Sequence, residues 1–166
     1  MLRELSENGQ RPKAAVIACS DSRVPVEMIF NVSTPGILFV IRVPGNIVCG
    51  QIIEGSLEFA IQQLKIPYIV ILGHTECGAV KARIDQSNCG GSMSKMLSSI
   101  KIESLELKQA VMDNLDHQFQ NLLEVGCVQK AVKKGELVVN SMVYDLHTGK
   151  IAVRNRVGNS PIKTVL

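Results

Sequence analysis

The feature that most constrains the fold is the apolar run YIVILG at residues 68–73. It lacks the polar alternation of a half-exposed strand, as expected of a strand buried on both faces of a parallel sheet. The run AAVIA at 14–18 has the same character. Because such strands need cover on both faces, these two runs favour an α/β protein.

Strand and helix patterns alternate along the rest of the chain. Further strands are predicted at GILFVIRV (36–43) and ELVVNSMVYDL (136–146), and the turn HTGK leads into IAVR as a hairpin. Helical patterns cover 51–64, 78–84 and about 95–134. The alternation predicts a mainly parallel central β-sheet flanked by helices, with right-handed crossovers.

The length of 166 residues fits one domain that spans 1–166. Within it we expect a short N-terminal arm at 1–13. We also expect a flexible loop at 85–94, where QSNCGGSMS is rich in turn-forming residues.

The charge and the apolar runs limit the partners. The net charge of +3 includes no basic stripe with interleaved aromatic residues, so nucleic-acid binding is not expected. No apolar run reaches the roughly 18 residues of a membrane span. The N-terminal MLRELSENGQRPK lacks the apolar segment of a secretory signal. These features predict a cytoplasmic protein, and the charge balance is compatible with a small anion as substrate.

The five cysteines are an odd number, which indicates metal ligation or free thiols rather than a disulfide framework. Cys19 directly follows the strand at 14–18, and His74 follows the strand at 68–73, so both belong at the carboxyl edge of the sheet. Cys77 forms an H-x-x-C pair with His74. Thiolate and imidazole suit zinc, and three protein ligands leave one position open, as in catalytic zinc sites.

Asp21 and Arg23 stand two residues apart in the same loop as Cys19. A guanidinium can bind a carboxylate through two hydrogen bonds, which fixes its orientation and keeps it ionised. An isolated surface pair of this kind is worth little. Beside three candidate metal ligands, the pair instead indicates a functional role.

The segments CSDSRVP and GHTECGAV together resemble the paired signature of the β-class carbonic anhydrases. The stretches PGILFVIRVPGNIV and GSLEFAI between them are similar to the connecting segments of that family. The likeness runs from about Pro12 to Ile84 and resumes at GELVVNSMVYDLHTGKI.

The resemblance implies reversible hydration of CO2 to bicarbonate and a proton by a zinc-bound hydroxide. It implies one Zn²⁺ per chain and a homodimer or a dimer-based oligomer. The residues that it assigns are Cys19, His74 and Cys77 as zinc ligands, Asp21 and Arg23 as the catalytic dyad, and Gly78 and Val43 at the substrate. At Val43 the family commonly has asparagine. Apolar candidates for the wall of the site are Val24, Val43, Ile47 and Val48.

Two alternatives remain open on the sequence. The same scaffold and ligands would serve a hydrolase of carbonyl sulfide or carbon disulfide. The chain could also be a non-catalytic zinc protein in which Asp21 permanently takes the fourth metal position.

Overall fold

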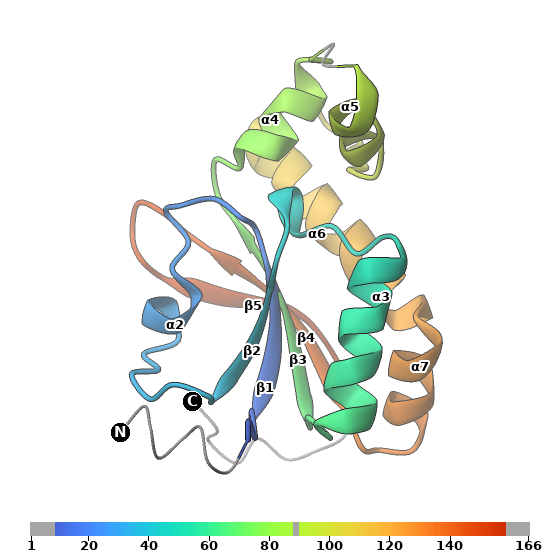
Figure 1. Ribbon diagram of the computed structural model, residues 1–166. Coiled ribbons are helices and arrows are strands. Elements are labelled where there is room, and N and C mark those ends of the chain that lie inside the picture. Colours follow the sequence, from blue (N-terminus) through green and yellow to red (C-terminus); the bar gives the residue numbers. More distant parts are fainter. Residues whose placement is uncertain (1–8, 88–89, 159–166) are drawn as a thin grey trace.

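A five-stranded sheet forms the centre of the computed structural model, which describes residues 9–87 and 90–158 (Figure 1). The strand order is β2-β1-β3-β4-β5. The first four strands run parallel and β5 runs antiparallel to β4, which confirms the predicted mainly parallel sheet and its terminal hairpin. The strands are β1 (Ala14–Ala18), β2 (Leu38–Arg42), β3 (Tyr68–His74), β4 (Val138–Tyr144) and β5 (Ile151–Val157).

Helices connect and flank these strands (Figure 1). The α-helices are α2 (Val26–Ile29), α3 (Gln51–Glu58), α4 (Gly78–Ile84), α5 (Gly91–Ser98), α6 (Leu107–Glu124) and α7 (Gly126–Lys133). A short 3-10 turn, η1 (Pro44–Asn46), follows β2, and a π-helical segment, η2 (Phe59–Gln63), continues α3.

Both faces of the central strands are buried, as the apolar runs predicted. Ile17 and Ile71 pack with α3, α6 and α7 through residues such as Leu115. Their neighbours Val16 and Leu72 point to the opposite face and pack against the segment around α2. The period of two along a strand produces this division.

The helical region expected over about 95–134 is divided, and the loop expected at 85–94 is shorter than predicted. Helix α5 begins at Gly91, and residues 99–106 and Val125 interrupt the helical path. The sequence does contain the spacing of an apolar helix face here, at Met93, Met96 and Leu97. The preceding glycines, which are typical of loops, outweighed this pattern in the prediction. Residues 88–89 of that loop, and 1–8 of the N-terminal arm, lie outside the described residues.

Within residues 9–87 and 90–158, no helix is long and apolar enough to cross a membrane. The cytoplasmic location stays a prediction.

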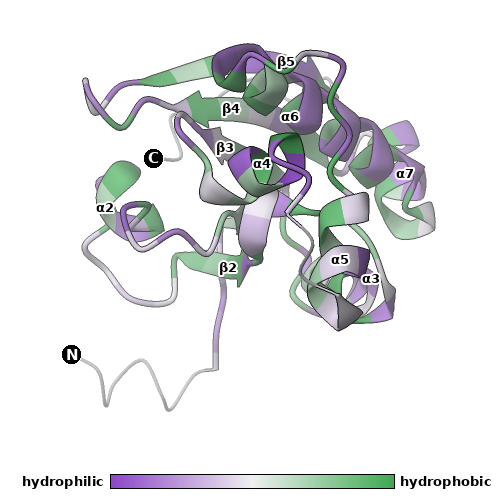
Figure 2. Ribbon diagram, turned by 90° about the horizontal axis from the view of Figure 1, so that it is seen from above, coloured by the Kyte–Doolittle hydropathy of each residue, from purple (hydrophilic) through white to green (hydrophobic). Residues whose placement is uncertain are grey.

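The carboxyl ends of β1 and β3 lie side by side, since these strands are paired in register from Ala15 and Ile69 to Ala18 and Leu72. Seen from above, α4 lies in the middle of the molecule between β3 and β2, with α2 on one side and α5 on the other (Figure 2). The residues at the carboxyl ends of β1 and β3 therefore lie close to the first residues of α4.

Candidate metal centre

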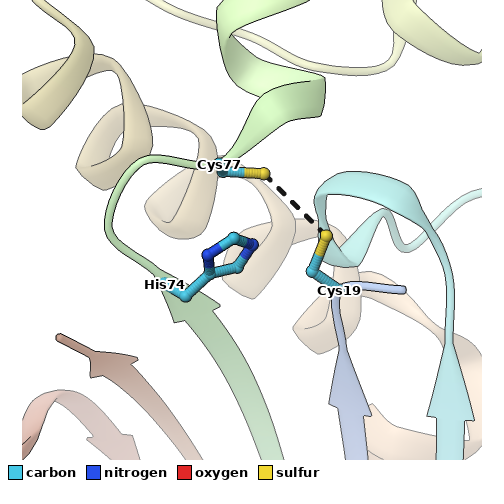
Figure 3. Close-up of side chains that lie close together, drawn as sticks. All are labelled: Cys19, His74 and Cys77. Carbon is cyan, nitrogen blue, oxygen red and sulfur yellow. Dashed lines mark hydrogen bonds between the residues drawn. The ribbon is translucent and has the colours of Figure 1, made fainter. Parts of the chain in front are cut away.

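Three side chains from separate elements converge at this edge of the sheet. Cys19 follows β1, His74 is the last residue of β3, and Cys77 directly precedes α4 (Figure 3). The Sγ atoms of Cys19 and Cys77 are 3.9 Å apart, and the possible ligand atoms of all three residues lie within 4.8 Å of one another. All three residues are at most 3% exposed.

The hydrogen bonding of His74 leaves one ring nitrogen for a metal. Nδ1 lies 2.9 Å from the carbonyl oxygen of Thr75, which can only accept, so Nδ1 carries the hydrogen. Nε2 is then a lone-pair donor. It is buried and has no hydrogen-bond partner among the described residues, an arrangement that is costly without a ligand. A backbone carbonyl that fixes the ring in this way is typical of metal-bound histidines.

The spacing and chemistry of the donors fit a tetrahedral zinc ion. Two thiolates bonded to zinc at ~2.3 Å with tetrahedral angles are about 3.8 Å apart. The observed sulfur–sulfur distance of 3.9 Å agrees with this value. Two thiols and one imidazole form a borderline-soft donor set that leaves one position open.

The two neighbouring thiols affect each other's ionisation in opposite directions. Cys77 hydrogen-bonds to Cys19 and thereby lowers the pKa of the Cys19 thiol, while the same interaction raises the pKa of Cys77. The backbone N–H of Gly45 also donates to the Cys19 Sγ at 3.2 Å. A cation bound by both sulfurs would allow both thiols to ionise, because it stabilises the two thiolates at once.

The turn between His74 and Cys77 brings the two ligands to the same point. Glu76 adopts a positive φ of 56°, which is uncommon outside glycine and reverses the chain within one residue. The backbone N–H of Thr75 donates to the carbonyl of Tyr144, which anchors the turn to the end of β4.

Asp21 and Arg23 form the predicted pair beside these ligands. Arg23 donates from Nε to Oδ1 at 3.0 Å and from Nη2 to Oδ2 at 2.7 Å, and its backbone N–H also donates to Oδ1. These bonds hold the pKa of Asp21 well below its usual range. Oδ2 lies 3.9 Å from His74 Nε2, but the carboxylate is not part of the group of three possible ligands.

Arg42, the last residue of β2, holds this loop in place and was missed in the sequence analysis. Its guanidinium donates to the carbonyl of Cys19 at 3.0 Å and to that of Asp21 at 2.6 Å. The only sequence signal was a charged residue at the end of an apolar strand.

Two polar side chains of α6 were also missed. Asn114 and Gln118 are at most 1% exposed. Asn114 donates to the carbonyl of Gly45, and Gln118 accepts from the backbone N–H of Val48, so both hold the segment that follows β2 over Cys19. Their i, i+4 spacing among apolar residues was the available signal.

The four apolar residues that the sequence suggested for the wall of the site lie in different packing clusters. Val43 and Ile47 pack in the cluster that contains Cys19 and Cys77. Val24 and Val48 are buried in other parts of the core, and a contact of either with the substrate stays a prediction. Gly78 is exposed at the first position of α4, and a Cβ atom there would meet nothing within 4 Å.

Of the other cysteines, the two that the structure describes, Cys49 and Cys127, do not join the group. Cys49 is exposed and Cys127 is half-buried on α7, and both are free thiols. Cys89 lies outside the described residues.

Comparisons with known proteins agree with this geometry. A family model described as carbonic anhydrase matches residues 14–151. A carbonic anhydrase of Pseudomonas aeruginosa is 35% identical, with 86% of this chain and 73% of the relative covered. Carbonic anhydrase 2 of Mycobacterium tuberculosis is 29% identical, with 91% and 78% covered.

Solved structures extend the likeness to the whole fold. A tetrameric β-carbonic anhydrase of Sordaria macrospora matches with a TM-score of 0.85 and 26% identity, covering 96% of this chain and 88% of that one. A Coccomyxa β-carbonic anhydrase in complex with acetazolamide matches with a TM-score of 0.80 and 29% identity, covering 92% and 77%.

The chain therefore belongs to the carbonic anhydrase family, and its fold is that of the β class. These relatives do not favour the alternative of a carbonyl sulfide or carbon disulfide hydrolase, nor that of a non-catalytic zinc protein.

Proposed function

We propose that this protein catalyses the reversible hydration of CO2 to bicarbonate and a proton, with one Zn²⁺ per chain held by Cys19, His74 and Cys77. The observation that carries the proposal is the convergence of these three buried donors. Within the described part of the chain, no hydrogen bond uses the Nε2 atom of His74, which lies among them. When bound, zinc would supply Lewis acidity that makes water a nucleophile near neutral pH.

Asp21 is the proposed orienting group. The two hydrogen bonds from Arg23 keep its carboxylate ionised and fix its plane. Oδ2 accepts from Arg23 and retains a second lone pair, with which it would accept a hydrogen bond from the attacking water and direct that water toward CO2.

Arg23 and Arg42 would act on Asp21 from two sides. Arg23 restrains the carboxylate, and also donates to the carbonyl of Glu76 at 3.2 Å, which ties the dyad to the turn between two ligands. Arg42 holds the backbone of Asp21. These contacts would keep the Asp21 carboxylate from binding the metal, so that it can orient the attacking water.

Gly78 and Val43 are the proposed contacts of the substrate. The exposed first position of α4 offers a backbone N–H that is not used within the helix and would suit a bicarbonate oxygen. Val43, packed against the cluster around Cys19, would present an apolar surface to CO2.

The test is metal analysis combined with stopped-flow CO2 hydration for the wild type, Cys19→Ser and Cys49→Ser. We expect one zinc per chain in the wild type and in Cys49→Ser, whose thiol is exposed. Cys19→Ser should lose zinc on dialysis and at least about 100-fold in hydration, because metal Lewis acidity supplies several kcal/mol of transition-state stabilisation. Full activity in zinc-free Cys19→Ser of native circular dichroism would refute the proposal.

We also propose that the chain assembles into homodimers, or oligomers built from them, through the β2–α3 face, defined by Phe39, Ile52 and Phe59. Ile52 is 82% exposed and Phe59 46% exposed. The rings of Phe39 and Phe59 lie 6.2 Å apart beside an open groove that also includes Gly55. A second copy is the proposed occupant, since the similar Sordaria enzyme is tetrameric.

Strand β2 supports that choice of occupant. It lies at the edge of the sheet, and none of the described strands pairs with its outer side (Figure 1). It contains neither lysine nor proline, the residues that commonly protect an exposed edge. A second β2 related by a two-fold axis would satisfy the free backbone groups.

A further inference from the structure

The hydration reaction, on which this inference rests, releases one proton at each turnover. The three proposed metal ligands are almost fully buried, so an exposed titratable group near them would speed the passage of the proton to buffer. A suitable group is titratable near neutral pH, lies at the rim of the site, and keeps a fixed position. Histidine is the side chain whose ordinary pKa meets the first condition.

All three histidines of the chain are among the described residues. His74 belongs to the metal centre. His117 lies half-buried on α6, where it contacts Asn121, and burial lowers its pKa. His147 lies in the turn between β4 and β5, and its side chain is 71% exposed.

A series of polar contacts connects the residues beside the metal centre to His147. Oδ2 of Asp21 lies 3.9 Å from His74 Nε2 and accepts a hydrogen bond from Arg23. Nη1 of Arg23 lies 3.9 Å from Oε2 of Glu76. Oε1 of the same Glu76 carboxylate lies 2.9 Å from Nε2 of His147. The imidazole is therefore joined to the turn that carries two of the proposed ligands.

The turn that carries His147 is held by several hydrogen bonds. Oδ1 of Asp145 accepts from the backbone N–H groups of His147 and Thr148 at 2.8 and 2.9 Å. The backbone N–H of Leu146 donates to Oγ1 of Thr75 at 3.0 Å, which links the turn to the residue after His74. These bonds fix the backbone that carries the imidazole, and the contact with Glu76 holds the exposed ring beside the turn between His74 and Cys77.

We propose that His147 is the proton-transfer residue of this enzyme, carrying the proton of each hydration event from the site to buffer. A ring nitrogen of the neutral imidazole accepts the proton through solvent at the rim. The imidazolium then gives it to a buffer base, which returns His147 to the neutral form. No bond to carbon forms or breaks in this step. Arg23 stays protonated throughout and relays no proton.

The charges around His147 suit this role. Glu76, from the turn before α4, raises the pKa of His147 above its ordinary value through its hydrogen bond and its charge. Asp145, on the same hairpin, acts in the same direction, and the small burial opposes both. A group that titrates near neutral pH exchanges protons efficiently in both directions.

The experiment compares zinc-loaded wild type, His147→Gln and His117→Gln in stopped-flow CO2 hydration at low and high buffer concentration. Glutamine at 147 keeps a hydrogen-bond donor for Glu76 but cannot titrate. In dilute buffer we expect kcat of His147→Gln to fall about 10-fold or more. Its kcat/KM should stay unchanged, since that ratio reports the steps up to bicarbonate formation. Added imidazole should restore kcat, and His117→Gln should match the wild type.

An undiminished kcat of His147→Gln in dilute buffer would overturn this role. So would an equal fall of kcat and kcat/KM that imidazole does not restore, since that result indicates a structural effect. A zinc-loaded wild type without hydration activity would instead overturn the proposed function itself. As a second measurement, NMR titration should give His147 a pKa above 6.5 that falls in Glu76→Gln.

Discussion

At the scale of single residues, the site depends on buried polar groups. Asn114 donates to the carbonyl of Gly45 at 3.0 Å, and the N–H of Gly45 in turn donates to the Cys19 sulfur at 3.2 Å. Gly45 has a φ of 67°, and a Cβ there would lie 3.0 Å from the side chain of Ile100. A buried amide on α6 therefore positions the donor that faces a proposed metal ligand.

Asn114→Leu should lower the free energy of unfolding by about 1–3 kcal/mol, because it leaves the Gly45 carbonyl buried without this partner. Urea unfolding measures this loss. Asn121→Leu is the matched control on the same helix, where the amide is only part-buried and its hydrogen bonds are 3.3–3.5 Å long. We expect that control to lose less than about 0.5 kcal/mol. Equal losses in the two variants would contradict the assigned contact.

At the scale of elements, the sequence pattern predicted helix through the segment 99–106, which lies between α5 and α6 and is not helical. Asp113 of α6 accepts from the backbone N–H groups of Glu103 and Ser104 at 2.9 and 3.0 Å. The side chain of Glu106 accepts from the N–H groups of Lys108 and Gln109 and so caps α6. These side-chain contacts compete with a continuous helix.

Asp113 should give the protein an acid-sensitive contribution to stability. Burial raises its pKa, but the hydrogen bonds from Gln109, Glu103 and Ser104 outweigh burial and lower it overall. A lowered folded-state pKa adds stability above the unfolded value of about 3.9, and this stability is lost as the pH falls through the folded pKa. Asp113→Asn should therefore be less stable than the wild type at pH 6, and the difference should shrink below about pH 4.

Urea unfolding between pH 3 and 6 measures this difference. Glu124→Gln, at the exposed end of the same helix, should follow the wild-type curve throughout. A constant difference between Asp113→Asn and the wild type across the range would argue against the titration of Asp113.

At the scale of the whole molecule, one edge of the sheet and one helix surface remain exposed on the same side. Strand β2 is half-buried along most of its length, and Ile52 of the neighbouring helix is almost fully exposed. An exposed apolar edge of this kind promotes association unless a partner covers it. The proposed dimer covers both features at once.

Ile52→Glu should shift the protein from dimers or larger oligomers toward monomers, because it places a charge in the centre of the β2–α3 face. Sedimentation velocity at several concentrations measures the shift. Leu105→Glu is the control, since Leu105 is also exposed, at 74%, but lies in the segment before α6. A monomeric wild type, or the same dissociation in both variants, would contradict the proposed interface.

The parts of this protein that depend on local pattern could be predicted from the sequence alone. The buried strands at 14–18 and 68–73, the short helix at 78–84 and the terminal hairpin were predicted because alternation and apolar runs report burial directly. The ligand candidates Cys19 and His74 were found because each stands at the end of an apolar strand, and Cys77 because it forms an H-x-x-C pair with His74. Asp21 and Arg23 were found because they share a loop with Cys19.

The distant groups that support the site became visible in the three-dimensional structure. Arg42 and Asn114 reach the Cys19 loop from β2 and α6, and His147 reaches Glu76 across 71 residues of chain. Such contacts follow from the order and register of the strands and from the packing of α6 against β3. Residue spacing within a segment carries no information about them, because partners far apart in sequence meet only once the sheet has formed.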